Sequence, residues 1–313
     1  MSPNTAGILL IGFGGPASPG EVRPFLRAVA RGRNIPEARL EEVAHHYELA
    51  GGYSPYNETV LRQAAALRET LARSGLRVPV HVGMRNWPPL LGEALEQLAR
   101  NDVRRVVGFV LAPHRCEASF ERYVASVNAA RKELGERAPE VEYTGGWHDH
   151  PLFIEAVAAQ VQHAMEKLPE AERAGAHLLF SAHSIPQAMA AGSTYADEFK
   201  MSASMVAAAL KRTSWSLAYQ SRSGDPREPW LEPKIEHAIE SLAGSAVIVV
   251  PVGFVCENVE LLYDLDIEIA ALARSRGVTM VRARAVNDDP RFVEMMAAMI
   301  SARLDGAAGP ATS

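Results

Sequence analysis

Eight short runs of apolar, mostly β-branched residues alternate along the chain with longer stretches in which apolar residues recur every three or four positions. The first pattern is typical of buried strands and the second of helices with one apolar face. The predicted strands cover residues 7–11, 78–82, 105–111, 141–144, 177–181, 216–219, 246–251 and 280–284. The clearest helices cover 58–74 and 152–167. Strands that alternate with helices predict parallel sheets covered on both faces, which is the α/β class.

The strand-and-helix pattern also repeats. Four blocks of the first half resemble four blocks of the second half in the same order: 7–16 with 177–186, 79–95 with 216–239, 105–123 with 246–264, and 148–157 with 287–296. The sequence therefore predicts a duplicated fold, with one lobe at 1–149 and the other at 150–313. Ligands of open α/β sheets bind beyond the carboxyl ends of the strands, so we expect a cleft between the lobes, lined by the loops that follow the strands.

Composition narrows the classes of protein that this fold can serve. A length of 313 residues fits two domains, and a net charge of −5 leaves no basic surplus for binding nucleic acid. The two cysteines, Cys116 and Cys256, are too few for a four-cysteine cluster, and we expect two free thiols. The longest apolar run, 246–255, is too short to cross a membrane, and no signal peptide precedes the first strand. These features predict a cytoplasmic protein.

Two segments carry candidate chemistry. His183 follows a predicted strand between small residues, which places it at the cleft, although a histidine can equally be a satisfied structural residue. Glu260, Asp264 and Glu268 stand at i, i+4 and i+8, on one face of a helix. Like charges at this spacing destabilise a helix by about 0.2–0.5 kcal/mol per pair, so the row is either a solvated face or a functional one. Carboxylates are hard ligands suited to a hydrated divalent cation.

The sequence resembles the ferrochelatase family, in order, from about residue 7 to residue 300. The motifs that carry the resemblance are Gly-x-Gly-Gly-Pro at 12–16, Gly-Gly-x-Ser-Pro at 51–55, Val-Gly-Met-Arg at 82–85, Ser-Ala-His-Ser-x-Pro at 181–186, Gln-Ser at 220–221, Pro-Trp-Leu-x-Pro at 229–233 and Glu-x-x-Tyr-Asp-x-Asp-x-Glu at 260–268. The resemblance implies two Rossmann-like lobes of the type II chelatase fold, with a last helix near 291–304 that packs back on the first lobe. It also implies a lyase that inserts Fe2+ into a free-base porphyrin during heme synthesis. Fe2+ is then a substrate, and neither a tightly bound cofactor nor an iron–sulfur cluster is expected.

Site residues follow from the resemblance, position by position. His183 and Glu260 match the pair that faces the porphyrin centre, where one accepts porphyrin protons and the other delivers iron; the resemblance does not say which. Asp264 and Glu268 match an acidic row proposed to relay the metal. The porphyrin-contacting positions are Phe13, Arg31, His46, Tyr47, Ser54, Tyr123 and Trp230.

The chain departs from the family pattern at several of these places. The family usually reads Ser-Asp-His-x-Glu where this chain has Cys-Glu-Asn-Val-Glu at 256–260, and Phe13 stands where relatives carry Tyr or Met. Ala30 and His46 stand where arginines are expected, although the pattern around Arg31 and Tyr47 resembles the coproporphyrin type. Coproporphyrin III and protoporphyrin IX both stay open as substrates.

Two other functions also stay open. One is a type II chelatase that inserts cobalt or nickel into another tetrapyrrole, and the other is a non-enzymatic tetrapyrrole or heme carrier with a degenerate site. For partners we expect the porphyrin and Fe2+, no nucleic acid and no transmembrane segment. We expect a monomer, and peripheral contact with a membrane stays open.

Overall fold

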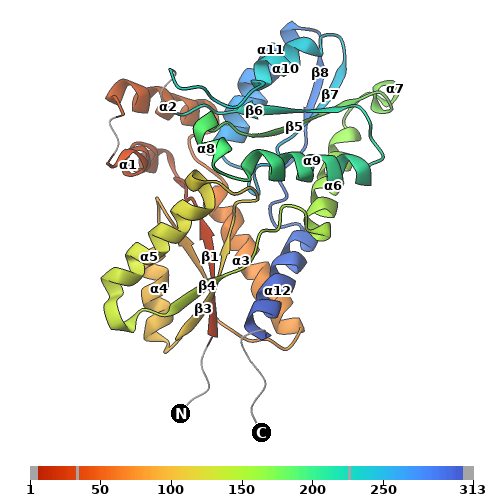
Figure 1. The fold of residues 1–313 in the computed structure, drawn as a ribbon. Coiled ribbons are helices and arrows are strands. Elements are labelled where there is room, and N and C mark those ends of the chain that lie inside the picture. Colours follow the sequence, from red (N-terminus) through yellow and green to blue (C-terminus); the bar gives the residue numbers. More distant parts are fainter. Residues whose placement is uncertain (1–5, 33–34, 225–226, 306–313) are drawn as a thin grey trace.

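The computed structural model describes residues 6–32, 35–224 and 227–305 and contains two parallel four-stranded sheets (Figure 1). The first sheet consists of β1 (Ala6–Gly12), β2 (Val80–Met84), β3 (Arg105–Val110) and β4 (Glu140–Tyr143). The second consists of β5 (His177–His183), β6 (Trp215–Gln220), β7 (Ala246–Val250) and β8 (Thr279–Arg282). Each of the eight predicted strands is present, and the α/β prediction is confirmed.

The two sheets have the same topology. The strand orders are β2-β1-β3-β4 and β6-β5-β7-β8, and all neighbouring pairs are parallel. The central strands β1 and β5 read as continuous apolar runs because both of their faces are covered by helices. The equal strand order supports the duplication predicted from the repeated blocks.

Helices connect the strands in both halves. The first half holds α1 (Pro19–Ala30), α2 (Glu37–Leu49), α3 (Tyr56–Arg73), α4 (Leu91–Arg100), α5 (Arg122–Leu134) and the short helices η1 (Glu117–Glu121) and η2 (Gly135–Arg137). The second half holds α6 (Pro151–Met165), α7 (Glu170–Arg173), α8 (Gln187–Ala191), α9 (Tyr195–Ala209), α10 (Ile235–Ser241), η3 (Leu261–Ile269), α11 (Ala270–Ser275) and α12 (Pro290–Asp305).

Each sheet is covered on both faces. Helix α3 packs on one face of the first sheet, where it buries the i, i+4, i+7 set Val60, Ala64 and Leu67, and α4 and α5 cover the other face. In the second half, α6 and α9 cover one face, and α10, α11 and η3 cover the other. The last helix, α12, packs on α3, α6 and β3, so it lies beside the first sheet (Figure 1).

One apolar core runs through both halves. Its buried side chains come from both sheets, and an aromatic cluster of Phe109, Trp147, Phe153 and Phe292 occupies the junction. Phe109 belongs to β3, Trp147 precedes α6, and Phe292 lies on α12. The predicted division between residues 149 and 150 therefore separates the two sheets but not the core, which is continuous across it. The division into two lobes stays a proposal. Residues 1–5 and 306–313 of the predicted lobes lie outside the described residues.

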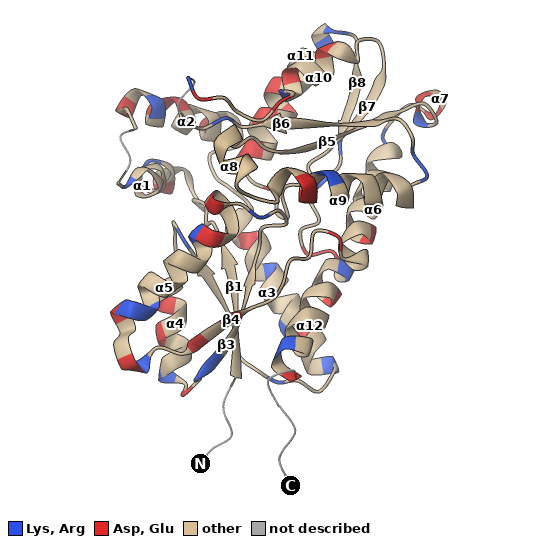
Figure 2. Ribbon diagram, viewed as in Figure 1, with Lys and Arg blue, Asp and Glu red and all other residues tan. Residues whose placement is uncertain are grey.

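Three further features of the described residues concern surface charge, the two cysteines and the length of the helices. Figure 2 shows acidic and basic residues mixed along the helices of both halves. Cys116 and Cys256 are both free and buried. Within the described ranges, the helices are all too short or too polar to cross a membrane.

Candidate active site

His183 and Glu260 meet at the ends of neighbouring strands of the second sheet. His183 ends β5, and Glu260 lies in the segment after β7, with 3.8 Å between His183 Nε2 and Glu260 Oε1. His183 Nδ1 donates a hydrogen bond of 2.6 Å to the Ser184 carbonyl oxygen, because a carbonyl can only accept. In the neutral ring this leaves a lone pair on Nε2, the nitrogen beside Glu260. The two side chains keep 28% and 41% of their surface exposed, so a substrate can reach both.

A glycine and a tyrosine hold this pair in place. A Cβ on Gly253 would lie 2.7 Å from Ala182 Cα, so only glycine lets the segment after β7 pack directly on the end of β5. Gly253 N also donates to the Ser181 carbonyl oxygen at 3.1 Å. From the other side, the Tyr195 hydroxyl donates to the His183 carbonyl oxygen at 2.8 Å. The sequence thus fixes the backbone of His183 before any substrate arrives.

The acidic row, which the sequence placed on one face of a helix, lies on a π-helix. Glu260 is the residue before η3, and Asp264 and Glu268 lie within it. The i→i+5 hydrogen bonds of a π-helix take more residues per turn than an α-helix, so residues four apart stay closely aligned. A second π-helix, η1, follows β3 at the equivalent place in the first half. Single π-turns occur mostly at functional sites, so their position at the two matching strand ends marks the cleft.

Asp264 is a half-buried member of the row. The Ser221 hydroxyl donates a hydrogen bond to Asp264 Oδ2. Burial, and after it the nearby Glu260 carboxylate, raise the pKa of the Asp264 carboxyl to about 7, against the lowering effect of the Ser221 hydrogen bond. Glu268 accepts a hydrogen bond of 3.2 Å from the Tyr263 hydroxyl. Asp264 therefore gains or loses a proton near neutral pH, next to a carboxylate that is open to the cleft.

This titration gives a testable pH dependence of stability. The pKa of Asp264 is about 7 in the folded protein, and its ordinary value is 3.8. Between pH 3.8 and about pH 7 the folded protein therefore keeps a proton that the unfolded chain has released. The free energy of unfolding therefore falls as the pH rises through this range, by a few kcal/mol at about 1.4 kcal/mol per pKa unit. Asp264→Asn should unfold like the wild type at low pH and be more stable at pH 8, as measured by urea unfolding. Equal stability at pH 8 would contradict this account of the carboxyl.

Phe13, Phe25, Tyr47 and Trp87 form an aromatic cluster in the first half. Phe13, which follows β1, is 38% exposed and packs edge-on against Phe25 at 6.4 Å between ring centroids. Phe25 in turn packs edge-on against Tyr47 and Trp87. Burial raises the pKa of the Tyr47 hydroxyl, and the Glu260 carboxylate adds to this shift. Tyr47 therefore lies close enough to the acidic segment to feel its charge.

Tyr123 and Ser54 are placed by the same half of the chain. Burial raises the pKa of the Tyr123 hydroxyl; a charge on Arg85 lowers it, and Cys256 and Glu260 raise it further. Ser54 is buried against the glycine turn, where a Cβ on Gly15 would approach Ser54 Oγ to 3.0 Å. The glycine turn predicted from the sequence therefore serves close packing around Ser54.

The remaining candidates lie at three different places. The His46 ring stacks on Tyr263 at 3.8 Å between centroids, which attaches α2 to the acidic π-helix, and burial lowers the pKa of the imidazole. Trp230 is buried and pairs through its backbone with Pro186, so it supports the loop that follows His183. Arg31 is exposed at the end of α1, and no contact within the described residues joins it to the other candidates.

Three contacts of the site could not be read from the sequence. Ser221 was seen only as part of a motif, yet it bonds Asp264 from the end of β6 with a φ of +60°. Tyr195 and Tyr263 were not assigned roles at all. The signal that could have found Ser221 is its place just after a strand, the same rule that pointed to His183.

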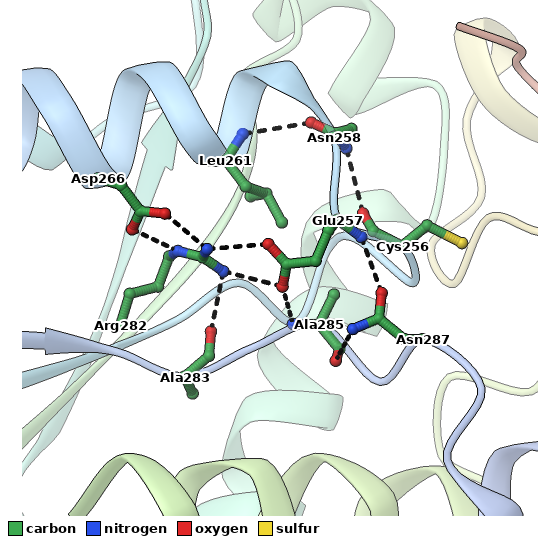
Figure 3. Close-up of polar contacts among 9 residues, drawn as sticks. All are labelled: Cys256, Glu257, Asn258, Leu261, Asp266, Arg282, Ala283, Ala285 and Asn287. Carbon is green, nitrogen blue, oxygen red and sulfur yellow. Dashed lines mark hydrogen bonds and ion pairs between the residues drawn. The ribbon is translucent and has the colours of Figure 1, made fainter. Parts of the chain in front are cut away.

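A polar network supports the segment that carries Glu260 (Figure 3). Arg282 forms ion pairs of 2.8 Å with Glu257 and 2.7 Å with Asp266, and the Glu257 side chain also accepts from the Ala285 backbone N at 2.8 Å. Asn258, which departs from the family pattern, accepts a hydrogen bond of 3.2 Å from Leu261 N through its side chain. Asn258 thereby satisfies a backbone donor in the first turn of η3, as a helix-capping residue does.

The architecture defines the class of the protein first. Two like α/β halves with a histidine–carboxylate pair at their strand ends define a type II chelatase arrangement. The solved structure of the sirohydrochlorin chelatase SirB from Bacillus subtilis subspecies spizizenii, in complex with cobalt, superposes with a TM-score of 0.57 at 10% identity and covers 97% of each chain. At that identity the likeness shows the fold alone.

The sequence comparisons then give the family. The Ferrochelatase family model matches residues 5–304. The chain is 39% identical over 300 residues to the ferrochelatase of Rhodopirellula baltica, with 95% of this chain and 85% of that protein covered. It is also 39% identical over 305 residues to the coproporphyrin III ferrochelatase of Mycolicibacterium smegmatis, with 96% and 90% covered. The chain belongs to the ferrochelatase family, which consists of lyases.

Proposed function

We propose that this protein inserts Fe2+ into a free-base porphyrin as a step of heme synthesis, with His183 and Glu260 as the reacting side chains. The observation that carries the proposal is the 3.8 Å pair of His183 Nε2 and Glu260 Oε1, whose side chains keep 28% and 41% of their surface exposed. The relatives that bear the name ferrochelatase support the metal and the reaction.

The chemistry needs a base and a metal ligand on one face of the macrocycle. A free-base porphyrin carries two N–H protons, which must leave as Fe2+ enters. The free Nε2 lone pair of His183 can accept these protons one at a time and pass each to solvent, to which the side chain is 28% exposed, and the Glu260 carboxylate is a suitable oxygen ligand for the incoming metal. A planar ring hides its nitrogen lone pairs, so a rigid cleft that bends the ring uses binding energy to expose them.

Asp264 and Glu268 supply the metal in this proposal. They continue the row from Glu260 along η3, and the Ser221 hydroxyl fixes the position of Asp264. Because burial raises the pKa of Asp264 to about 7, an arriving cation displaces a proton from this carboxyl. The row thus exchanges protons for metal next to the residue that must present the metal to the porphyrin.

We propose coproporphyrin III as the porphyrin. Relatives named coproporphyrin III ferrochelatase share 38–39% of their residues with this chain over more than 300 positions. Anaerobic Fe2+ insertion should proceed with kcat/KM at least about tenfold higher for coproporphyrin III than for protoporphyrin IX, a ratio that one well-placed polar contact can supply. Steady-state absorbance assays on both porphyrins measure the ratio. A preference for protoporphyrin IX would overturn the substrate assignment and leave iron insertion itself standing.

The similar proteins also indicate which metal is inserted. Those named ferrochelatase are 39% identical to this chain, whereas the cobalt complex belongs to a protein only 10% identical to it. Iron is therefore favoured over cobalt or nickel. A cytoplasmic location, a monomeric state and the lack of a tightly bound cofactor remain proposals from the sequence.

A further inference from the structure

A buried glutamine connects the two halves of the molecule. Gln63 lies on α3 with none of its surface exposed, and its Nε2 donates a hydrogen bond of 2.7 Å to the carbonyl oxygen of Asn287, which follows β8. The same Nε2 lies 3.4 Å from Cys256 Sγ. Gln63 Oε1 has no hydrogen-bond partner among the described residues. The amide therefore satisfies the buried Asn287 carbonyl at the cost of one unpaired acceptor of its own.

Asn287 passes this contact on to the segment that carries Glu260. Its backbone has a φ of +48°, and its own N–H donates to the Val255 carbonyl oxygen at 2.9 Å. Its side-chain Oδ1 accepts from Glu257 N at 2.9 Å, and its Nδ2 donates to the Ala285 carbonyl oxygen at 3.0 Å (Figure 3). Asn287 is 6% exposed, so each of these bonds is shielded from water.

The other end of the same helix holds the turn after β1, which carries Phe13. The Tyr56 hydroxyl, at the start of α3, accepts a hydrogen bond of 3.1 Å from Phe13 N. Asn57 Oδ1 accepts one of 2.8 Å from Gly15 N. Tyr56 and Gln63 are seven residues apart, which is two helical turns, so they lie on one face about 10 Å apart along the axis.

We infer that α3 sets the distance between the turn after β1 and the segment after β7, and that Gln63 is a positioning residue that sets Glu260 relative to Phe13. This inference rests on the proposed function, because it gives Glu260 a reaction to be positioned for. The path runs from Phe13 through Tyr56 and along α3 to Gln63. It continues through Asn287 to Glu257, three residues before Glu260.

The test uses Gln63→Met in the full-length protein, with Fe2+ and coproporphyrin III as the probes. Methionine keeps the length and most of the volume of glutamine and removes the donor. We expect kcat for iron insertion to fall about tenfold, as for other losses of groups that orient a metal ligand, with the KM for porphyrin little changed. Arg62→Met is the matched control: Arg62 is the neighbouring residue, and its exposed 3.2 Å ion pair with Asp288 reaches the same loop. Exposed pairs contribute little, so the control should keep wild-type kcat.

A double-mutant cycle separates positioning from general loss of stability. If Gln63 acts through Glu260, then Gln63→Met should cause no further loss of kcat in a protein that already carries Glu260→Gln. Tyr56→Phe, which creates no large cavity, should lower kcat about two- to tenfold, the range expected for one lost hydrogen bond. This variant tests the other end of α3 should Gln63→Met fold poorly.

The outcomes distinguish the two levels of the proposal. A wild-type protein that inserts no iron overturns the proposed function, and the positioning role falls with it. If the wild type is active and Gln63→Met keeps full kcat, the positioning role alone is overturned. It is also overturned if Gln63→Met lowers kcat by the same factor in the Glu260→Gln protein as in the wild type. If Gln63→Met does not fold, full kcat in Tyr56→Phe contradicts the spacing role of α3.

Discussion

Glu260→Gln and His183→Ala each lower kcat for iron insertion by about 10²–10⁴-fold, the range expected when a positioned acid–base group is lost. The physical reason is the same pair of atoms in both cases. His183 Nε2 and Glu260 Oε1 lie 3.8 Å apart at the open cleft, one with a free lone pair and the other with a charge. In the proposed mechanism, removing either would leave a porphyrin proton without an acceptor or the metal without a ligand.

The measurement compares variants that remain folded and still bind porphyrin. Both side chains are partly exposed, so their replacement leaves no buried cavity, and the unfolding temperature should change little. His163→Ala is a suitable control, because His163 lies exposed on α6 outside the proposed site. It should insert iron at the wild-type rate. Full activity in either His183→Ala or Glu260→Gln would contradict the assignment of roles.

Phe292→Ala lowers the free energy of unfolding by about 3–5 kcal/mol, the usual cost of replacing a fully buried phenylalanine. Phe292 is fully buried on α12 and packs against Trp147 at 5.6 Å and against Phe109 at 6.5 Å between ring centroids. Aromatic pairs add about 0.5–1.5 kcal/mol beyond the buried area, so the loss should lie toward the upper part of this range. Urea unfolding at pH 7 measures it.

Met299→Ala provides the comparison for this prediction. Met299 lies on the same helix but is only partly buried, so its loss should cost less than half as much. Similar losses in the two variants would show that the aromatic cluster is not the point at which α12 joins the two halves.

The strands were accessible from the sequence for a clear reason. Each central strand is buried on both faces, so it must be a continuous apolar run, and short turns limit where it can end. The same reasoning located His183 and Glu260, because strand ends of parallel sheets meet at one edge. The site residues taken from the family resemblance remain proposals for function, although the structure places His183, Glu260 and Asp264 together.

The parts that escaped prediction depend on contacts between distant segments. The spacing of Glu260, Asp264 and Glu268 fits an α-helix nearly as well as the π-helix that is present. Gln63 reads as an ordinary polar position of a helix, because its partner Asn287 lies 224 residues further along the chain. The stacking of His46 on Tyr263 joins α2 to η3 in the same way. No local pattern records such contacts.

Anaerobic incubation of the wild-type protein with Fe2+ and coproporphyrin III, followed by absorbance, tests the central claim most directly. The account predicts that the free-base bands disappear over many turnovers and iron coproporphyrin accumulates, and that Glu260→Gln binds the porphyrin but inserts iron about 10²–10⁴-fold more slowly. A wild-type protein that binds coproporphyrin III tightly and leaves it metal-free would contradict the account and point to a carrier.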